Sequence, residues 1–396
     1  MNQTIFAKLS IMMLLEYFIW GAWYVTMGTY MSTFLQSSGV QIGAAYSALA
    51  IATMISPFFV GMVADRFFAA QKIMGVLHIL GGVLLYLATT IENNTAFYWV
   101  ILFYSLLYMP TIALSNSIAF QQMTDPGKQF PWIRVFGTLG WIVAGIMIGQ
   151  LGIEKTSATF KMAAFSSLAL GAFSFVLPNT PPKGKTTESA IGTEAFVLFK
   201  DKPYLIFFIA AILVCVPLSF YYGFANLFLN EAGMENAAGK MILGQFSEAI
   251  FILAIPFLFN NIGVKNMLLL GMTAWILRYV CFAFGNVEAG LWMLYAGIIL
   301  HGICYDFFFV TGYMYTEKKA GEKIKNAAQG LFTFATYGVG MFIGTWFSGF
   351  TTDYYTTDNV HNWQSIWFVP TYIAIGVLVY FIFFFNEKKK IETAIK

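Results

Sequence analysis

Five ionisable residues interrupt long apolar segments of this chain. They are Glu16, Arg134, Glu248, Arg278 and Asp306. A charged side chain at the centre of a membrane-spanning helix costs about 2.5–3.5 kcal/mol to insert, so it is kept only where it pairs, lines a wet cavity or carries out chemistry. A structural ion pair would explain any one of the five, but the set favours a polar path through a membrane protein.

Spacing places polar and aromatic residues on shared helix faces, because residues three or four apart lie side by side on a helix. The groups are Arg134, Thr138 and Trp141; Gln245 and Glu248; and His301 and Tyr305. They combine hydrogen-bond donors and acceptors with flat aromatic faces, which suits a neutral, partly aromatic ligand such as a nucleoside. Packing explains any single aromatic residue more simply, since aromatic residues make up 18% of the chain.

Carboxyl groups inside a low-dielectric site can carry protons, because burial disfavours their charged form and a nearby cation favours it. Asp306 and Glu248 are the candidates, and Arg134 is the candidate cation. We predict that Asp306 carries the proton while Glu248 mainly holds the sugar, because Asp306 lies deep in its segment beside Tyr305.

The other polar or reactive residues in these segments are assigned structural roles. Arg278 is expected to form a structural pair or to extend toward the cytoplasmic face, and His78 to be a neutral, hydrogen-bonded core residue. Cys215, Cys281 and Cys304 lack metal-ligand spacing and are expected to be buried free thiols. No metal site is predicted.

The elements that must position these residues are transmembrane helices. Of the 396 residues, 59% are hydrophobic and 10% are charged, whereas soluble domains carry about 25% charged residues. Twelve apolar segments have the length of about 20 residues that a bilayer requires. They cover roughly residues 8–34, 42–64, 72–91, 96–121, 132–153, 159–178, 204–230, 237–260, 265–285, 288–314, 325–350 and 363–386. The predicted fold is an all-α integral membrane protein with twelve transmembrane helices.

A polar segment with prolines at both ends separates the first six predicted helices from the last six. Its composition is typical of a linker rather than of a folded domain. We predict an N-terminal six-helix half over 1–178, a cytoplasmic linker over 179–203 and a C-terminal six-helix half over 204–396. The halves are expected to be pseudo-repeats with a binding site at their interface.

Basic residues are distributed unevenly between the predicted loops. With the N-terminus in the cytoplasm, the external loops hold only Lys155, Lys161 and Lys240 of the 22 Lys and Arg residues; Arg134 and Arg278 lie within helices. Because cytoplasmic loops carry the excess of Lys and Arg, both termini are predicted to be cytoplasmic.

The loop after the second predicted helix reads GMVADRFFAAQK and resembles the signature of the major facilitator superfamily. Gly61, Asp65 and Arg66 occupy matching positions, whereas Phe68 and Ala69 replace the usual glycine and basic residue. The resemblance implies the superfamily fold and a conformational latch, in which the charges of this loop hold helix ends on the cytoplasmic side and favour the outward-open state. A plain cytoplasmic turn is the alternative.

Segments from six predicted helices together resemble the nucleoside:proton symporter family, which comprises bacterial nucleoside and xanthosine permeases. They are FIWGAWYVTMGTYM, LLYMPTIALSNSIAF, PWIRVFGTLGW, FSEAIFILAIPFLF, AWILRYVCFAFG and HGICYDFFFVTG. The similarity is in register over nearly the full length. It implies proton-coupled import of nucleosides across the bacterial inner membrane by alternating access. We expect no cofactor beyond the proton gradient, no nucleic-acid partner, and a monomer in the lipid bilayer.

The resemblance also implies site residues. The residues that match the family are Arg134, Thr138, Trp141, Gln245, Glu248, Tyr305 and Asp306, whereas Tyr222 and His301 stand at family positions with a different residue. The residues predicted to bind the substrate are Arg134, Thr138, Trp141, Tyr222, Gln245, Glu248, His301 and Tyr305, and those predicted to couple the proton are Asp306 and Glu248. Ser219 and Tyr222 stand where the family's nucleoside permease has amides, so base preference is expected to differ. His301 replaces a tyrosine and Glu16 replaces a glutamine, and this extra carboxylate puts the family's simple proton balance in question.

Three alternatives remain open. A proton-coupled sugar or oligosaccharide permease would also use Glu, Arg and Trp in its site. An integral membrane enzyme would need a nucleophile with a base or a metal cluster, and the three histidines lie in no such motif, so no enzyme is predicted. An export antiporter is disfavoured because the glycine-rich fifth helix lacks the proline of the usual antiporter motif.

Overall fold

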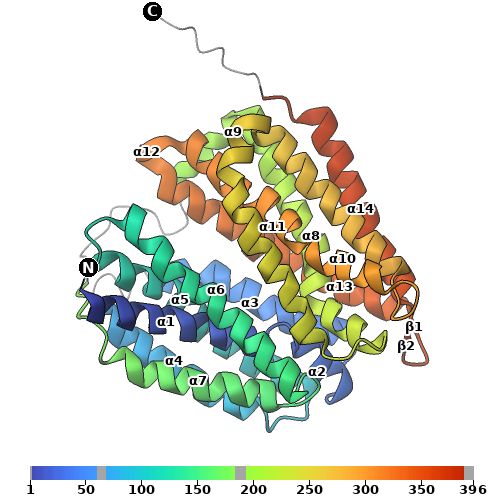
Figure 1. The fold of residues 1–396 in the computed structure, drawn as a ribbon, viewed down its shortest axis with the longest axis horizontal. Coiled ribbons are helices and arrows are strands. Elements are labelled where there is room, and N and C mark those ends of the chain that lie inside the picture. Colours follow the sequence, from blue (N-terminus) through green and yellow to red (C-terminus); the bar gives the residue numbers. More distant parts are fainter. Residues whose placement is uncertain (1, 60–67, 183–192, 388–396) are drawn as a thin grey trace, which may run out of the picture.

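The computed structural model describes residues 2–59, 68–182 and 193–387, and it is mostly helical (Figure 1). The first set of helices comprises α1 (Gln3–Trp23), α2 (Met27–Thr33), α3 (Gly39–Phe59), α4 (Ala70–Ala88), α5 (Asn94–Gln121), α6 (Pro126–Leu151) and α7 (Ala158–Ser174). The second set comprises the 3-10 helix η2 (Thr193–Lys200), α8 (Lys202–Glu231), α9 (Ala237–Phe284), α10 (Leu291–Ile299), α11 (His301–Tyr305), the π-helix η3 (Asp306–Val310), α12 (Thr311–Thr333), the π-helix η4 (Phe334–Gly340), α13 (Met341–Tyr354) and α14 (Trp363–Phe384). The short strands β1 (Thr356–Thr357) and β2 (Val360–His361) pair antiparallel before α14.

Ten helical segments within the described residues are long and apolar enough to cross a membrane, as expected of a multi-pass membrane protein. The other two predicted spans coincide with shorter or divided elements. Helix α7 has 17 residues, and the segment predicted over 325–350 is divided among α12, η4 and α13. The middle of that segment is π-helical, not α-helical.

The first predicted span, 8–34, is broken between α1 and α2. The hydroxyl of Tyr46, on α3, donates to the Tyr24 carbonyl oxygen at 2.6 Å and accepts from the Gly28 amide at 3.2 Å. It takes the place of the backbone hydrogen bond that would join residues 24 and 28 in a continuous helix. The predicted span is present as one membrane-length segment, Gln3–Thr33, and a side chain from another helix is inserted at the break within it.

The turn predicted between residues 260 and 265 lies inside α9. Gly263 has φ 75° and ψ 165°, and glycine adopts a positive φ without a Cβ clash. Helix α9 therefore contains two membrane-length segments, Ala237–Ile255 and Asn261–Phe284.

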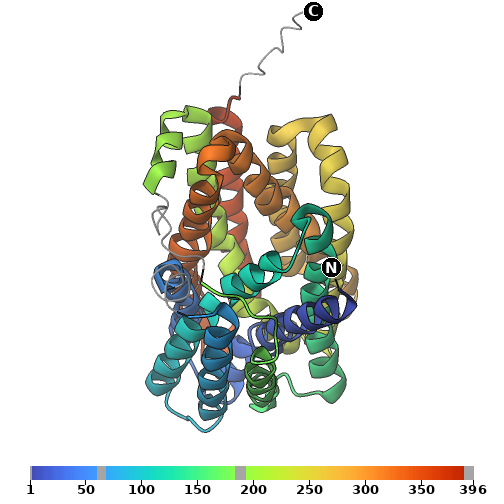
Figure 2. The ribbon, with the colours of Figure 1, turned by 90° about the vertical axis from the view of Figure 1, so that its left-hand side faces the viewer.

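Two large hydrophobic cores and one small cluster of Ile255, Met267 and Phe307 are buried among the described residues. One large core is formed almost entirely by residues of α1–α7, and the other almost entirely by residues from η2 to α14. Figures 1 and 2 show the first set, blue to green, lying below the second set, which runs from light green to red. Each set therefore buries its own apolar side chains, and contacts between the sets are confined to particular helices.

The two sets approach closely where α3 meets α13. A Cβ atom on Gly43 would lie 2.2 Å from the carbonyl oxygen of Thr345. Inside the first set, a Cβ atom on Gly140 of α6 would lie 2.1 Å from the carbonyl oxygen of Leu14 on α1. Only glycine permits such close approach of two backbones, as at other contacts between membrane helices.

The predicted latch residues Gly61, Asp65 and Arg66 lie outside the described residues, as do residues 183–192 of the predicted linker. Their roles stay predictions from the sequence.

Candidate functional site

A cavity of about 620 Å³ lies between the two sets of helices, and this volume is typical of small-molecule sites. All eight residues predicted to bind the substrate line it, namely Arg134, Thr138, Trp141, Tyr222, Gln245, Glu248, His301 and Tyr305. Helix α6 contributes the first three, α8 the fourth, α9 the next two and α11 the last two. The fold thus brings together residues far apart in the sequence.

Aromatic rings form part of the cavity wall. Trp20 packs edge-on against Trp141 with ring centroids 5.6 Å apart, and the ring of Tyr24 lies 5.3 Å from that of Tyr222. Rings packed in this way present faces and edges to a planar ligand. Trp20 and Tyr24 were not among the predicted site residues, although their spacing of four places them on one face at the end of α1, where Tyr24 is the C-cap.

Helix α6 brings a guanidinium group to the cavity. The Cζ atom of Arg134 lies 4.0 Å from the ring centroid of Tyr17, within the range of a cation–π interaction. Gly137 leaves room for it, because a Cβ atom there would lie 2.5 Å from Nη1 of Arg134. All three residues line the cavity. The cation therefore lies at the cavity wall against an aromatic face, in the space that the glycine leaves free.

A carboxylate and an imidazole approach each other on α9 and α11. Nη1 of Arg278 lies 3.0 Å from Nδ1 of His301. Arginine only donates hydrogen bonds, so Nδ1 accepts, and the neutral ring carries its proton on Nε2. That nitrogen faces Oε2 of Glu248 at 3.8 Å. Arg278 thereby orients the donor that His301 presents toward Glu248.

Arg278 does not extend toward the cytoplasmic face, and that part of its prediction is wrong. Its side chain is wholly buried (0% exposed), and its Cζ atom lies 3.4 Å from the ring centroid of Tyr221 and 5.6 Å from that of Trp275. Aromatic faces stabilise a cation in a desolvated place. These rings and His301 therefore hold the guanidinium where the sequence suggested an ion pair or an exposed end.

Hydroxyl groups of the second set complete the cavity. The hydroxyls of Tyr305 and Tyr337 lie 2.5 Å apart, and those of Tyr313 and Thr333 lie 2.9 Å apart. All four residues line the cavity. Tyr337 belongs to the π-helix η4, a distortion that is frequent at functional sites, and its position was not predicted from the sequence.

Asp306 is set apart from the other predicted residues, because it is not among those that line the cavity. It follows Tyr305, begins the π-helix η3 and is 0% exposed. Neither of its carboxylate oxygens has a hydrogen-bond partner among the described residues. An unpaired buried charge costs several kcal/mol, so a proton bound to Asp306 would remove that cost.

Ser219 does not reach the cavity. It is fully buried and donates to the carbonyl oxygen of Cys215 at 2.8 Å. Its hydroxyl is bonded along its own helix, so any effect of this position on base preference stays a prediction. Tyr222, the other departure from the family's amides, does line the cavity.

The remaining predicted residues lie away from the cavity. Glu16 and His78 are buried, and His78 is hydrogen-bonded as predicted, with Glu16 as one of its partners. Cys215 and Cys304 are buried free thiols, whereas Cys281 is partly exposed. Over the described residues, no group of three or more His, Cys, Asp or Glu is placed to hold a metal ion.

Hydrogen bonds join the two sets near one end of the molecule. Glu154, in the α6–α7 connection, accepts from the side-chain amides of Asn226 at 2.9 Å and Asn230 at 3.0 Å. Asp353, near the end of α13, accepts from the backbone amide of Val40 at 2.9 Å. These bonds lie at the end that the positive-inside rule predicts to be extracellular.

Comparison with known proteins identifies the family. The family described as nucleoside H+ symporter matches residues 1–390. The chain belongs to the nucleoside:proton symporter family. This confirms the resemblance seen in the sequence segments. The match and those that follow are to transporters, not to enzymes.

Three known or putative transporters resemble this chain over nearly its whole length. It is 43% identical to the putative nucleoside transporter YegT of Escherichia coli, covering 98% of this chain and 96% of that protein. It is 36% identical to the xanthosine permease of the same organism, with the same coverage. The nucleoside permease NupG of Escherichia coli is 33% identical, covering 96% of each chain.

Solved structures agree in fold. The crystal structure of nucleoside transporter NupG matches with a TM-score of 0.90 and 32% identity, covering 98% of this chain and all of that one. A bacterial homologue of the human lysosomal transporter Spinster matches with a TM-score of 0.73 at 13% identity, covering 96% and 94%. The nucleoside:proton symporter family member described here thus has the helical fold of major facilitator superfamily transporters.

Proposed function

We propose that this chain imports nucleosides together with protons across the bacterial inner membrane by alternating access. The observation that carries the proposal is the cavity between the two sets of helices, lined by Arg134, Glu248 and packed aromatic rings, in a chain of the nucleoside:proton symporter family. The names of its relatives refer to nucleosides and to xanthosine.

The substrate is proposed to lie among the eight predicted residues of the cavity. The base would pack against the rings of Trp20, Trp141 and Tyr222, because stacking suits any planar base. The ribose hydroxyls would bond to Gln245 and Glu248, whose side chains accept hydrogen bonds. Where an amide would read the edge of the base, Tyr222 offers one hydroxyl, so base discrimination should be weaker on that side.

Proton coupling is proposed to use Asp306 and Glu248, with no cofactor beyond the proton gradient. Asp306 would bind a proton in its unpartnered site, one residue from Tyr305 in the cavity wall. We expect Asp306→Asn, which is neutral and of similar size, to exchange nucleosides across the membrane without accumulating them. In proteoliposomes, counterflow measures exchange and net uptake measures accumulation, so the two assays together distinguish them. Full pH-dependent accumulation by this variant would exclude Asp306 as the proton carrier.

The chain is proposed to form a monomer of twelve transmembrane helices, with halves at 1–178 and 204–396, a cytoplasmic linker at 179–203 and both termini in the cytoplasm. The bonds of Glu154 and Asp353 support an inward-open arrangement in this topology. Gly61, Asp65 and Arg66 would form the opposing latch, which closes the cytoplasmic side in the outward-open state.

The test is uptake of labelled uridine and adenosine into cells that lack their own nucleoside permeases. Uptake should be faster at acidic pH and abolished by a protonophore, and excess sugars should not compete. Absence of uptake in cells shown to carry the protein in the membrane would contradict the proposal. Competition by a sugar or oligosaccharide would favour the sugar permease instead.

A further inference from the structure

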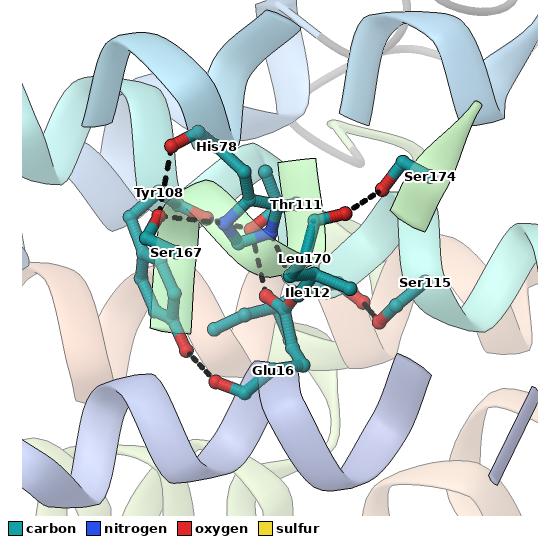
Figure 3. A network of polar contacts seen from close by, with 9 residues as sticks. All are labelled: Glu16, His78, Tyr108, Thr111, Ile112, Ser115, Ser167, Leu170 and Ser174. Carbon is teal, nitrogen blue, oxygen red and sulfur yellow. Dashed lines mark hydrogen bonds and ion pairs between the residues drawn. The ribbon is translucent and has the colours of Figure 1, made fainter. Parts of the chain in front are cut away.

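A second buried carboxylate lies in the first set of helices, outside the cavity (Figure 3). Glu16 of α1 is 0% exposed, and its Oε2 lies 2.8 Å from Nε2 of His78 on α4, which is 1% exposed. Oε1 accepts from the hydroxyl of Thr111 on α5 at 2.7 Å. The hydroxyl of Tyr108 donates to the backbone carbonyl of Glu16 at 2.6 Å. The proposed substrate site uses none of these groups.

The contacts around this pair require more hydrogen atoms than its ordinary forms supply. Ser167 donates to the carbonyl oxygen of His78 at 2.9 Å and lies 3.2 Å from Nδ1 of the same residue. The hydroxyl of Thr111 contacts Oε1 of Glu16 at 2.7 Å and the carbonyl oxygen of Tyr108 at 2.6 Å. With the contact between Glu16 and His78, five close contacts compete for the available hydrogen atoms, since each unshared hydrogen bond needs one hydrogen atom between its partners.

Two hydroxyl groups and a neutral imidazole provide three hydrogen atoms, and an ionised carboxylate provides none. Two of the contacts would then share a hydrogen atom or bring lone pairs together. One added proton supplies a fourth hydrogen atom, either on the carboxyl of Glu16 or on the second ring nitrogen of His78, so that only one of the five contacts still has to share. Both forms leave the pair without net charge, which is the state that a low-dielectric interior favours.

Phenols and a guanidinium surround the pair. The phenols are Tyr17 on α1 and Tyr104 and Tyr108 on α5. The guanidinium is that of Arg134 on α6, whose Cζ lies 4.0 Å from the ring centroid of Tyr17. Helix α7 contributes only the hydroxyl of Ser167 among the described contacts. Phenols are neutral and guanidinium is a cation throughout the ordinary pH range. A change of charge here near neutral pH therefore belongs to Glu16 and His78 themselves.

Helix α1 connects the pair to the cavity. Tyr17 follows Glu16 directly and Trp20 lies one turn further, and both line the cavity. The ring of Trp20 packs against that of Tyr108, with centroids 6.1 Å apart, and the hydroxyl of Tyr108 holds the backbone of Glu16. Loss of a proton from the pair would weaken the attachment of α1 to α4 and α5. It would thereby displace Tyr17 and Trp20, the part of the cavity lining that we call the aromatic wall.

We propose that Glu16 and His78 form a proton-binding site within the first set of helices, and that the bound proton holds the aromatic wall in the arrangement that binds a nucleoside. The second part rests on the proposed function, whereas the first does not. Acid then raises nucleoside affinity through this pair in addition to any effect of Asp306 and Glu248.

Whether the pair of Glu16 and His78 holds a proton can be measured spectroscopically, without a transport assay. The chain has three histidines, so 15N-histidine labelling in lipid nanodiscs gives few ring signals. His78→Asn assigns the signals of His78, and if that variant fails to fold, His361→Gln and His301→Gln assign them by elimination. Infrared difference spectra between the unaltered protein and Glu16→Gln report whether the Glu16 carboxyl is protonated.

We expect a protonated Glu16 carboxyl or a doubly protonated His78 ring at the acidic end of the range from about pH 5 to 8. The pair should lose this proton at higher pH. An ionised Glu16 beside a neutral His78 over the whole range would overturn the proposed site.

Coupling to the substrate is tested by calorimetric binding of uridine and adenosine at acidic and alkaline pH. Glu16→Gln is permanently neutral and imitates the protonated state. The affinity of this variant at acidic pH should match that of the unaltered protein. Between acidic and alkaline pH, the unaltered protein should lose affinity by a factor about five or more times larger than the variant does, since coupling between sites usually changes affinity by at least about fivefold. An unchanged pH dependence in Glu16→Gln would overturn the coupling.

The matched control is Glu231→Gln, because Glu231 forms a similar pair with His361 at 2.9 Å and neither residue lines the cavity. This control should keep the pH dependence of the unaltered protein. If the unaltered protein binds no nucleoside, the proposed function fails, and the spectroscopic measurement still decides whether the pair holds a proton.

Discussion

Arg278 does not line the cavity but donates to His301, which does, so we predict that it is a positioning residue. Arg278→Lys keeps the charge but loses the planar group that lies 3.4 Å from the Tyr221 ring and donates to His301 at 3.0 Å. Hydrogen bonds to charged groups contribute about 1.5–3 kcal/mol, so we expect nucleoside affinity to fall by about tenfold. Equilibrium binding of uridine to the purified variant measures the change.

A double-mutant cycle separates this role from a general effect on folding. Once His301→Gln has removed the imidazole, Arg278→Lys should have a smaller additional effect on affinity, since contacting residues are coupled. Purely additive effects of the two substitutions would show that Arg278 does not act through His301.

Residues of the cavity were predictable where spacing and family resemblance agreed, as for Arg134 with Thr138 or Gln245 with Glu248. The contact between Glu16 and His78 was not predictable, because the two residues lie 62 positions apart on different helices. Arg278 was misjudged for a related reason. A buried cation usually implies a carboxylate partner, and here aromatic rings and an imidazole take that place.

One hydroxyl group, that of Tyr46, bridges the break between α1 and α2. Tyr46→Phe leaves the carbonyl of Tyr24 and the amide of Gly28 without their bridging partner. An unsatisfied buried group costs about 1–3 kcal/mol, so we expect lower thermal stability in detergent. We also expect weaker nucleoside binding, because the ring of Tyr24 lines the cavity.

Thermal unfolding with and without uridine measures both effects. Tyr354→Phe is the control, since that tyrosine is 81% exposed and should change neither quantity. If Tyr46→Phe were as stable as the control, the two backbone groups would have found each other in a continuous helix.

Most helices follow directly from the apolar pattern, and the turn at Gly263 lies where the pattern weakens. The exceptions arise from contacts between elements. Tyr46 reaches from α3 to interrupt the first span, and the π-helices η3 and η4 place Asp306 away from the cavity and Tyr337 on it. A sequence pattern of period 3.6 does not show where such local changes of period occur.

At the end that the positive-inside rule predicts to be extracellular, Glu154 is one of the acceptors that join the two sets, and it has several donors. Oε2 of Glu154 accepts from Asn226, Asn230 and the backbone amide of Ala238, all from the second set of helices. A bond of this kind contributes about 1.5–3 kcal/mol. In alternating access, its loss should favour the state in which this end is open, and we expect Glu154→Ala to raise the outward-open population by about tenfold or more.

Spin labels on the two sets of helices can report that opening. Lys155→Cys and Glu235→Cys place labels at exposed positions of the α6–α7 and α8–α9 connections, and Cys281→Ser removes the partly exposed native thiol. The distance between labels should shift to larger values in Glu154→Ala. The control Glu92→Gln alters an exposed carboxylate within the first set and should leave the distribution unchanged. An unchanged distribution in Glu154→Ala would mean that close helix packing, as at Gly43 and Thr345, holds this end closed without the hydrogen bonds.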